Sequence, residues 1–311
     1  MTAPTFWVTG AYGFIGRYLA TELAQQGNLV AGIGHGHWPA FDAERWGVSH
    51  WNNGSIDAVN LDGLAELSGM PAGIFHLAGG SAVGPSLQAP LEDFNRTVAS
   101  GAAVFDWVRR RCADVPVLVV SSAAVHGAGH EASIAAGSPL NPYSPYGHHK
   151  LMLEQLAQAY AGSFDLRSSI VRLFSVYGAG LRKQLLWDLC SRLQSGVQHL
   201  ELGGTGEELR DWTEVTDVVR LLADAIAYSD VSVPVFNGGT GVGTSVSDVA
   251  RLLCAAWSPD VTYGFSGIRR AGDPFRLVSV PCEIDGKAFD WKVDVETGIA
   301  RYVDWFRREH V

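Results

Sequence analysis

Tyr146 and Lys150 lie four residues apart in the stretch NPYSPYGHHK (141–150). At this spacing two side chains share one face of a helix, about one turn apart. A phenol is a poor base at neutral pH because its ordinary pKa is about 10, and a nearby ammonium can lower that pKa by stabilising the phenolate. The pair is therefore a candidate for general acid and base chemistry. The alternative is the ordinary first turn of an amphipathic helix.

A pair of serines ends the apolar run VPVLVVSS (115–122), upstream of Tyr146. A hydroxyl at the carboxyl end of a strand can hydrogen-bond the substrate oxygen that Tyr146 protonates or deprotonates. Ser121 and Ser122 are both placed for this role. Simpler alternatives exist, because Lys150 could pair with Glu154 and Ser122 could cap the next element.

Three glycines with the spacing G-x-x-G-x-x-G follow the first predicted strand, in VTGAYGFIGRYL (8–19). A tight turn from strand to helix needs glycine for close backbone approach, and the N–H groups at the start of the helix then face a pyrophosphate. Gly10, Gly13 and Gly16 stand at the start of a βαβ unit, which favours dinucleotide binding over an ordinary glycine-rich turn.

The end of the second predicted strand lacks the acid that NAD enzymes usually place there for the adenosine ribose. Gly34 occupies that position in VAGIGHGHW (30–38). Nothing there repels a 2′-phosphate, and His35, His37 and Arg45 could attract one. NADP(H) is therefore as plausible as NAD(H), although the histidines could also decorate an exposed loop.

The elements that must position these residues alternate between strands and helices. The apolar runs at 5–10, 29–34, 73–79, 115–122 and 168–178 read as buried strands, and helical spacing of apolar residues occurs at 16–27, 97–111 and 147–162. Parallel strands with helical crossovers predict an α/β fold, a Rossmann-type doubly wound parallel sheet with a smaller C-terminal substrate domain. We expect a dinucleotide domain at 1–172, to which 233–259 returns, and a substrate domain at 173–232 and 260–311. The returning segment should end in a helix capped near Ser245 or Ser247.

Composition narrows the class of partner. The chain has 311 residues, is 47% hydrophobic and carries a net charge of −9. This charge argues against nucleic acid as a partner, although one or two arginines in a cleft could still bind a diphosphate. The four cysteines form no metal-ligand or disulfide pattern, so we predict no metal site and a cytoplasmic location. The sequence shows neither a signal segment nor a membrane span.

The motifs together resemble the extended short-chain dehydrogenase/reductases, and within them the NAD-dependent epimerase/dehydratase family that acts on nucleotide sugars. The resemblance runs essentially end to end, through TGAYGFIG (9–16), HLAG (76–79), SSAAVHG (121–127), SPYGHHK (144–150), RLFSVYGAGLRKQ (172–184), RDW (210–212) and RRAGDP (269–274). It implies a catalytic trio of Ser122, Tyr146 and Lys150.

The resemblance also implies ligand contacts. The cofactor residues would be Gly10, Tyr12, Gly13, Phe14, Ile15, Gly16, His35, Ser55, Ile56, Leu77, Ala78, Gly79, Tyr146 and Lys150. The substrate residues would be Ser81, Ser122, Ser175, Arg182, Arg210, Arg270 and Asp273. Guanidinium groups from separate loops can clamp a diphosphate. The alternative for Arg210 is a surface ion pair with Glu207 or Asp211.

Several positions depart from the family pattern. Ala123 and Ala124 replace the acid pair that follows the catalytic hydroxyl in dehydratases, so elimination lacks a catalyst. His149 replaces a Ser or Thr, Ser175 replaces an Asn of many 4-epimerases, and Thr97 replaces a helix Asn. These departures weaken assignment to UDP-glucose 4-epimerase itself.

The remaining chemistry is hydride transfer at a sugar carbon, most simply C4, of a nucleotide-diphosphate sugar. The missing acid at Gly34 favours, slightly, an NADPH-dependent reductase of a 4-keto-6-deoxy sugar. The alternatives are a 4-epimerase with tightly bound NAD and, third, a non-catalytic dinucleotide-binding protein. We expect a homodimer formed by the helices 97–111 and 147–162; a monomer would instead bury both helices against its own sheet.

Overall fold

The computed structural model describes residues 3–268 and 274–310. The chain forms two compact units. The first comprises Met1–Gly127, Ser138–Leu173 and Val219–Phe236, and the second Ala128–Gly137, Phe174–Val218 and Asn237–Val311. No helix within the described ranges is long and apolar enough to cross a bilayer.

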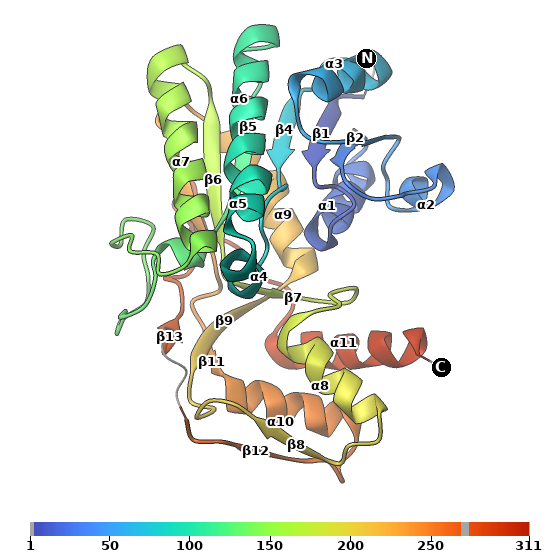
Figure 1. Cartoon of the computed structure of the whole chain (residues 1–311), viewed down its shortest axis with the longest axis vertical. Coiled ribbons are helices and arrows are strands. Elements are labelled where there is room, and N and C mark those ends of the chain that lie inside the picture. Colours follow the sequence, from blue (N-terminus) through green and yellow to red (C-terminus); the bar gives the residue numbers. More distant parts are fainter. Residues whose placement is uncertain (1–2, 269–273, 311) are drawn as a thin grey trace. The chain divides into compact units, whose positions relative to one another are not determined.

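A seven-stranded sheet forms the centre of the first unit (Figure 1). Its strands run in the order β10-β6-β5-β4-β1-β2-β3, and the pairings from β6 through to β3 are parallel. Every residue of β4 and β6 is buried, as expected for strands covered on both faces. The strands are β1 (Thr5–Thr9), β2 (Leu29–Gly34), β3 (His50–Asn53), β4 (Gly73–His76), β5 (Val117–Ser122), β6 (Ser168–Leu173) and β10 (Val235–Gly238). The predicted Rossmann-type fold is confirmed.

Three helices, α3 (Ala58–Ser68), α6 (Ser100–Arg111) and α7 (Pro145–Phe164), pack side by side on the sheet (Figure 1). Alternate strand residues such as Trp7, Ile74 and Val119 join them in one buried apolar cluster. The other elements of this unit are α1 (Phe14–Gln25), α2 (Ala40–Arg45), α4 (Val83–Gln88), α5 (Pro90–Phe94), η1 (Asn95–Ala99), η2 (Ala123–Val125) and η3 (Ile226–Tyr228).

The start of α7 is fixed by local sequence. Ser144 is the N-cap and its hydroxyl accepts a hydrogen bond of 3.2 Å from the N–H of Gly147, while Pro145 occupies the first turn, where its missing N–H costs nothing. The helix ends at Phe164, and its C-cap, Asp165, adopts a left-handed conformation. This defined start places Tyr146 in the first turn and Lys150 one turn later.

The run 168–178, predicted as one strand, is divided. Strand β6 ends at Leu173, and Ser175–Tyr177 form a separate strand, β7, which pairs with β9 (Leu209–Glu214) in another sheet. A continuous apolar run does not reveal where the chain changes sheet, because residues in both sheets are buried.

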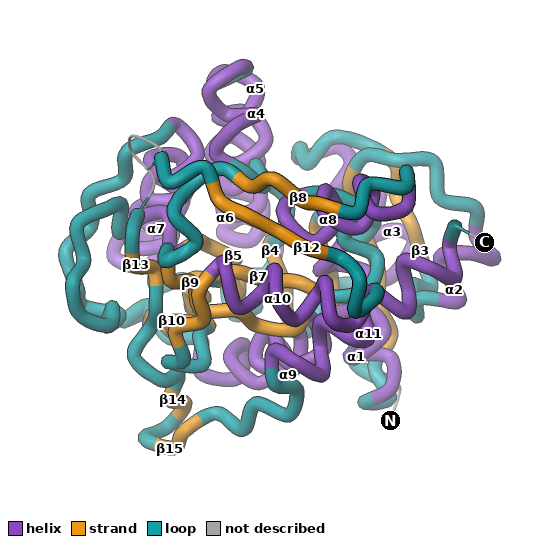
Figure 2. The backbone as a smooth tube through the Cα atoms, turned by 90° about the horizontal axis from the view of Figure 1, so that it is seen from below, coloured by secondary structure: helices purple, strands orange, loops and turns teal. Residues whose placement is uncertain are grey.

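The second unit contains the smaller sheets. Strand β9 pairs with β7, β11 (Gly243–Ser245) and β13 (Arg276–Leu277), whereas β8 (His199–Leu202) runs beside β12 (Thr262–Phe265), as Figure 2 shows. Its remaining elements are β14 (Glu283–Ile284), β15 (Lys287–Ala288), α8 (Gln184–Gln194), α10 (Val246–Trp257) and α11 (Val295–Glu309). Helix α9 (Val215–Ala225) contains the boundary to the first unit. Ser245 caps α10, as one of the two predicted positions.

Candidate active site

The glycine-rich turn joins β1 to α1 by close backbone contacts. Gly10 has a φ of +73°, and its N–H donates to the carbonyl of Ile33 over 2.7 Å. A Cβ atom on Gly16 would lie 2.3 Å from the carbonyl oxygen of Gly10, so no larger residue fits without moving backbone. The turn is thus shaped as the glycine spacing predicts.

The start of α1 fits a dinucleotide pyrophosphate. Its N-cap, Gly13, has no side chain to accept the first N–H groups, and the first turn, which begins at Phe14 and Ile15, contains no acidic residue. Unsatisfied N–H groups at a helix start attract phosphate. These residues would hold the pyrophosphate of the cofactor.

The loop after β4 approaches the catalytic helix. The N–H of Ala78 donates to the hydroxyl of Thr9 over 3.2 Å, and the N–H of Gly80 donates to the hydroxyl of Thr97 over 2.8 Å. A Cβ atom on Gly79 would lie 3.3 Å from Nζ of Lys150. The predicted cofactor segment 77–79 therefore lies beside one member of the trio.

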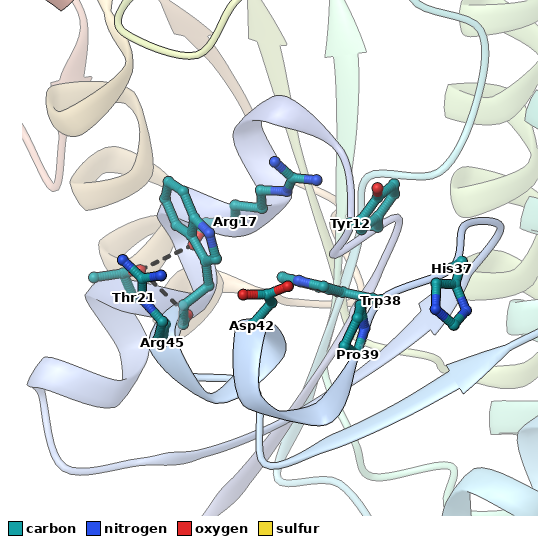
Figure 3. A pocket seen from close by; sticks show the side chains of 9 residues that line it. Tyr12, Arg17, Thr21, His37, Trp38, Pro39, Asp42 and Arg45 are labelled. Atoms are coloured by element: carbon teal, nitrogen blue, oxygen red, sulfur yellow. Dashed lines mark hydrogen bonds between the residues drawn. The ribbon is translucent and has the colours of Figure 1, made fainter. Parts of the chain in front are cut away.

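A pocket of about 460 Å³ lies between α1 and α2, beyond the end of β2 (Figure 3). The Arg17 guanidinium lies 4.4 Å from the centre of the Tyr12 ring and also faces Trp38, so aromatic rings surround this cation. The carboxylate of Asp42 points into the same pocket, which His37 and Arg45 also line. The pocket thus combines cations with an acid.

The other predicted adenosine contacts lie near the surface. His35 and Ser55 are exposed, whereas Ile56 is partly buried against the core. Gly34 packs against Trp51. No side chain at position 34 is available to accept a ribose hydroxyl, as the sequence indicates.

The three residues predicted to be catalytic, Ser122, Tyr146 and Lys150, all lie within the first unit. The phenol of Tyr146 and the hydroxyl of Ser122 form a hydrogen bond, and Ser122 Oγ also accepts the N–H of Ala124 over 3.2 Å. Lys150 is buried, and its Nζ donates to the carbonyl oxygen of Val120 over 2.9 Å. Ser122 therefore caps the next element, as the simpler alternative predicted, and also contacts Tyr146; its hydrogen bond to the substrate oxygen stays a prediction.

Burial changes the pKa values of Tyr146 and Lys150. Burial raises the pKa of Tyr146, the hydrogen bond from Ser122 opposes this change, and the charge of Asp93 adds to it. The net direction is therefore opposite to the lowered pKa of Tyr146 that the spacing to Lys150 predicts, because burial has the largest effect. Burial also lowers the pKa of Lys150 to about 8, against the opposing charges of Asp93 and Glu154.

The predicted alternative of a Lys150–Glu154 ion pair is wrong. Glu154 binds Arg172, with N–O distances of 2.9 and 2.7 Å, and accepts the hydroxyl of Ser121 over 2.5 Å. All three residues are buried. Ser121 therefore hydrogen-bonds the buried Glu154–Arg172 ion pair, whereas its neighbour Ser122 contacts Tyr146.

A second buried pair was not found from the sequence. The Asp93 carboxylate and Nδ1 of His149 lie 2.6 Å apart, and both residues are buried. The signal available was the unusual His149 before Lys150, but Asp93 is 56 residues away in sequence. The described residues contain no group of three or more His, Cys, Asp or Glu side chains that could hold a metal.

The predicted substrate residues fall in both units. Ser81 is exposed and Ser122 is partly buried in the first. In the second, Ser175 begins β7, Arg182 forms an ion pair with Glu309, and Arg210 in β9 donates to the carbonyl of Leu209 over 2.9 Å. Arg270 and Asp273 lie outside the described residues. Their contacts with substrate stay a prediction.

The parallel sheet, the glycine turn and the Ser–Tyr–Lys trio define an enzyme that uses a nicotinamide dinucleotide. The model of the NAD dependent epimerase/dehydratase family matches residues 6–239, and the chain belongs to this family. The family resemblance, the enzymatic character and the nicotinamide cofactor predicted from the sequence are confirmed.

Similar proteins are known from sequence and from structure. A UDP-glucose 4-epimerase of Azospirillum brasilense is 28% identical over 298 residues, covering 89% of this chain and 84% of the relative. The solved structure of MoeE5 in complex with UDP-glucuronic acid and NAD is 28% identical, with a TM-score of 0.83, and covers 98% of this chain and 99% of its own. The NAD-dependent NDP-hexosamine 5,6-dehydratase TunA is also 28% identical, with a TM-score of 0.82, and covers 98% of each chain.

Proposed function

We propose that this protein is a nucleotide-sugar 4-epimerase that retains NAD through the catalytic cycle. The main support is the hydrogen-bonded Tyr146 and Ser122 beside Lys150, in a chain whose curated relatives include UDP-glucose 4-epimerases over most of their length. MoeE5, at 28–29% identity, has been solved with NAD and either UDP-glucuronic acid or UDP-glucose. A uridine diphosphate sugar is therefore the proposed substrate.

The chain's own residues would move a proton at the sugar O4. Ser122 would hydrogen-bond O4, and ionised Tyr146 would take the hydroxyl proton and later return it. The Lys150 ammonium would favour the phenolate by its charge. When bound, NAD would supply the hydride acceptor and donor for C4. Epimerisation requires the keto sugar to present its other face before the proton returns to O4.

The pocket beside β2 favours NAD over NADP. The Arg17 guanidinium is surrounded by aromatic rings, and the Asp42 carboxylate would repel a 2′-phosphate that entered the pocket. Gly34, together with His37 and Arg45, which line the same pocket, favours NADPH, so a 4-keto sugar reductase is the second candidate. Ser175, Arg182, Arg210, Arg270 and Asp273 are the proposed substrate contacts in either case.

Assembly and location are part of the same proposal. Helices α6 and α7 pack one side on the sheet, whereas the apolar side chains of Met152 and Phe164 in α7 are exposed, and we propose that the two helices form the contact of a homodimer. The four cysteines are unpaired, which fits a cytoplasmic enzyme.

Mass spectrometry under native conditions, followed by proton NMR, tests the proposal. The purified protein should carry NAD and should interconvert UDP-glucose, or UDP-glucuronic acid, and its C4 epimer with no added cofactor. The Tyr146→Phe variant, which keeps the ring and loses the hydroxyl, should carry NAD but leave the sugar unchanged. Consumption of added NADPH with a 4-keto sugar, without epimerisation, would support the reductase instead.

A further inference from the structure

Asp93 and His149 form a buried acid–imidazole pair one residue from Lys150. Asp93, in α5, is 6% exposed and His149, in α7, is 9% exposed, and the carboxylate lies 2.6 Å from Nδ1. The Phe94 ring packs edge-on against the imidazole, with centroids 5.5 Å apart. Burying two ionisable groups is costly unless they are paired, so this contact is either a device for holding α5 on α7 or part of the chemistry.

The position of the Asp93 carboxylate favours a role in proton transfer. A Cβ atom on Gly80 would lie 1.8 Å from Oδ1 of Asp93, so the acid is in close contact with the loop that carries Gly79. Gly79 in turn lies beside Nζ of Lys150. Asp93 therefore borders the cofactor loop on one side and the helix of Tyr146 and Lys150 on the other.

We propose that Asp93 and His149 are positioning residues whose shared proton sets the charge at this edge, and thereby controls when Tyr146 and Lys150 hold their protons. With His149 neutral, the carboxylate contributes a full negative charge beside the trio. With His149 protonated, the pair is neutral as a whole.

The electrostatics of the trio agree with this geometry. The charge of Asp93 raises the pKa of both Tyr146 and Lys150. The elements packed against α5 are α4, η1 and α7. Besides Asp93 and His149, the charged or titratable groups of these elements and of α5 are Glu92 and Arg96, which pair at the surface, and Tyr146, His148, Lys150, Glu154 and Tyr160 of α7. Glu154 is bound to Arg172, which leaves Asp93 as the acid whose charge depends on a titratable partner.

A purely structural pair makes a different prediction. If Asp93 and His149 only fasten α5 to α7, their variants will change stability and leave the titration of Tyr146 in place. Fluorine NMR of protein labelled with fluorinated tyrosine distinguishes the two cases, because it reads the protonation of one phenol. The chain has nine tyrosines, and the Tyr146→Phe variant identifies the resonance of Tyr146.

The test compares Asp93→Asn with Glu92→Gln. Asp93→Asn keeps the size of the side chain and removes its charge, so the midpoint of the Tyr146 titration should move to lower pH, by roughly half a unit or more. Glu92→Gln removes the neighbouring charge, which lies at the surface in an ion pair with Arg96, and should leave the midpoint unchanged. An unchanged midpoint in Asp93→Asn would overturn the proposal.

A second variant decides the question if Asp93→Asn does not fold. The double variant Asp93→Asn/His149→Gln pairs two amides, which can hydrogen-bond each other without a charge, and it should also move the midpoint of the Tyr146 titration to lower pH. An unchanged midpoint in this variant would contradict the proposal. The inference concerns the mechanism of the proposed epimerase, but the titrations need no substrate. They can therefore succeed even if UDP sugars prove to be the wrong substrates.

Discussion

Two buried carboxylates, Glu154 in α7 and Asp93 in the neighbouring α5, contrast in their partners. Glu154 binds the guanidinium of Arg172 through two hydrogen bonds and also accepts the hydroxyl of Ser121. Asp93 binds only an imidazole, that of His149, among the hydrogen bonds described for its side chain. Arginine does not lose its proton at accessible pH, whereas histidine does.

This contrast suggests different roles for the two carboxylates: Glu154 stabilises the fold, whereas Asp93 lies beside the residues proposed to transfer protons. Glu154 joins α7 to β6 by a buried ion pair with Arg172. Asp93 and His149 lie beside the cofactor loop, Tyr146 and Lys150, where a change of charge can affect proton transfer. The same kind of buried acid therefore serves stability in one place and, by our proposal, regulation of proton transfer in the other.

Breaking the scaffold pair should have the largest effect on stability. Glu154→Gln leaves the Arg172 guanidinium buried without a counter-charge, which should cost about 3–5 kcal/mol of unfolding free energy. Urea denaturation measures this loss. Asp93→Asn, which keeps a neutral acceptor beside a group that can lose its charge, should cost clearly less. Equal losses of unfolding free energy in the two variants would contradict the view that Glu154 mainly stabilises the fold and Asp93 does not.

His76 shows what happens to a buried imidazole that has no acid partner. Its Nδ1 lies 2.9 Å from the hydroxyl of Thr9, and burial, with a smaller effect of the Lys150 charge, lowers its pKa to about 3 from 6.5. Between these values the unfolded chain binds the proton and the folded chain does not, so stability is full above pH 6.5 and falls as pH falls towards 3.

The expected loss from His76 is about 2 kcal/mol between pH 6.5 and pH 5. Urea denaturation of the wild-type protein and of His76→Gln at both pH values measures the share of this residue. The variant should lose less stability on acidification than the wild type. An equal loss would show that His76 is not the group responsible.

The adjacent residues Ser121 and Ser122 can be compared directly, because the same substitution should affect mainly stability at one position and mainly turnover at the other. Ser121→Ala removes a hydrogen bond to a charged acceptor and should cost about 1.5–3 kcal/mol of stability with little change in turnover. Ser122→Ala removes a cap and the partner of Tyr146, so it should cost about 1 kcal/mol of stability and mainly reduce turnover. Denaturation and NMR assays on both variants test this division, and the reverse pattern would exchange the two assignments.

The sequence predicts the elements whose signals are local. The second strand is found at Leu29–Gly34, as predicted, because its apolar run is bounded by turn residues. Tyr146 and Lys150 share a helix face because Ser144 and Pro145 fix the start of the helix. The glycine turn is likewise set by short-range contacts around Gly16.

Contacts between distant segments were not predictable from one sequence. The burial of Asp93 depends on a partner 56 residues away, and its helix, α5, has only five residues and no clear periodic pattern. The division of 168–178 into β6 and β7 depends on pairing with β9. The pKa of Tyr146 depends on how deeply its phenol is buried, and the spacing to Lys150 does not indicate this.

The most direct test is the rate of hydride transfer in Tyr146→Phe, followed by nicotinamide absorbance in a single turnover with UDP-glucose. Loss of the phenolic hydroxyl should slow transfer by roughly 10²–10⁴-fold while NAD stays bound at wild-type occupancy. Transfer at the wild-type rate with full NAD occupancy would show that the phenol is not the group that exchanges the proton.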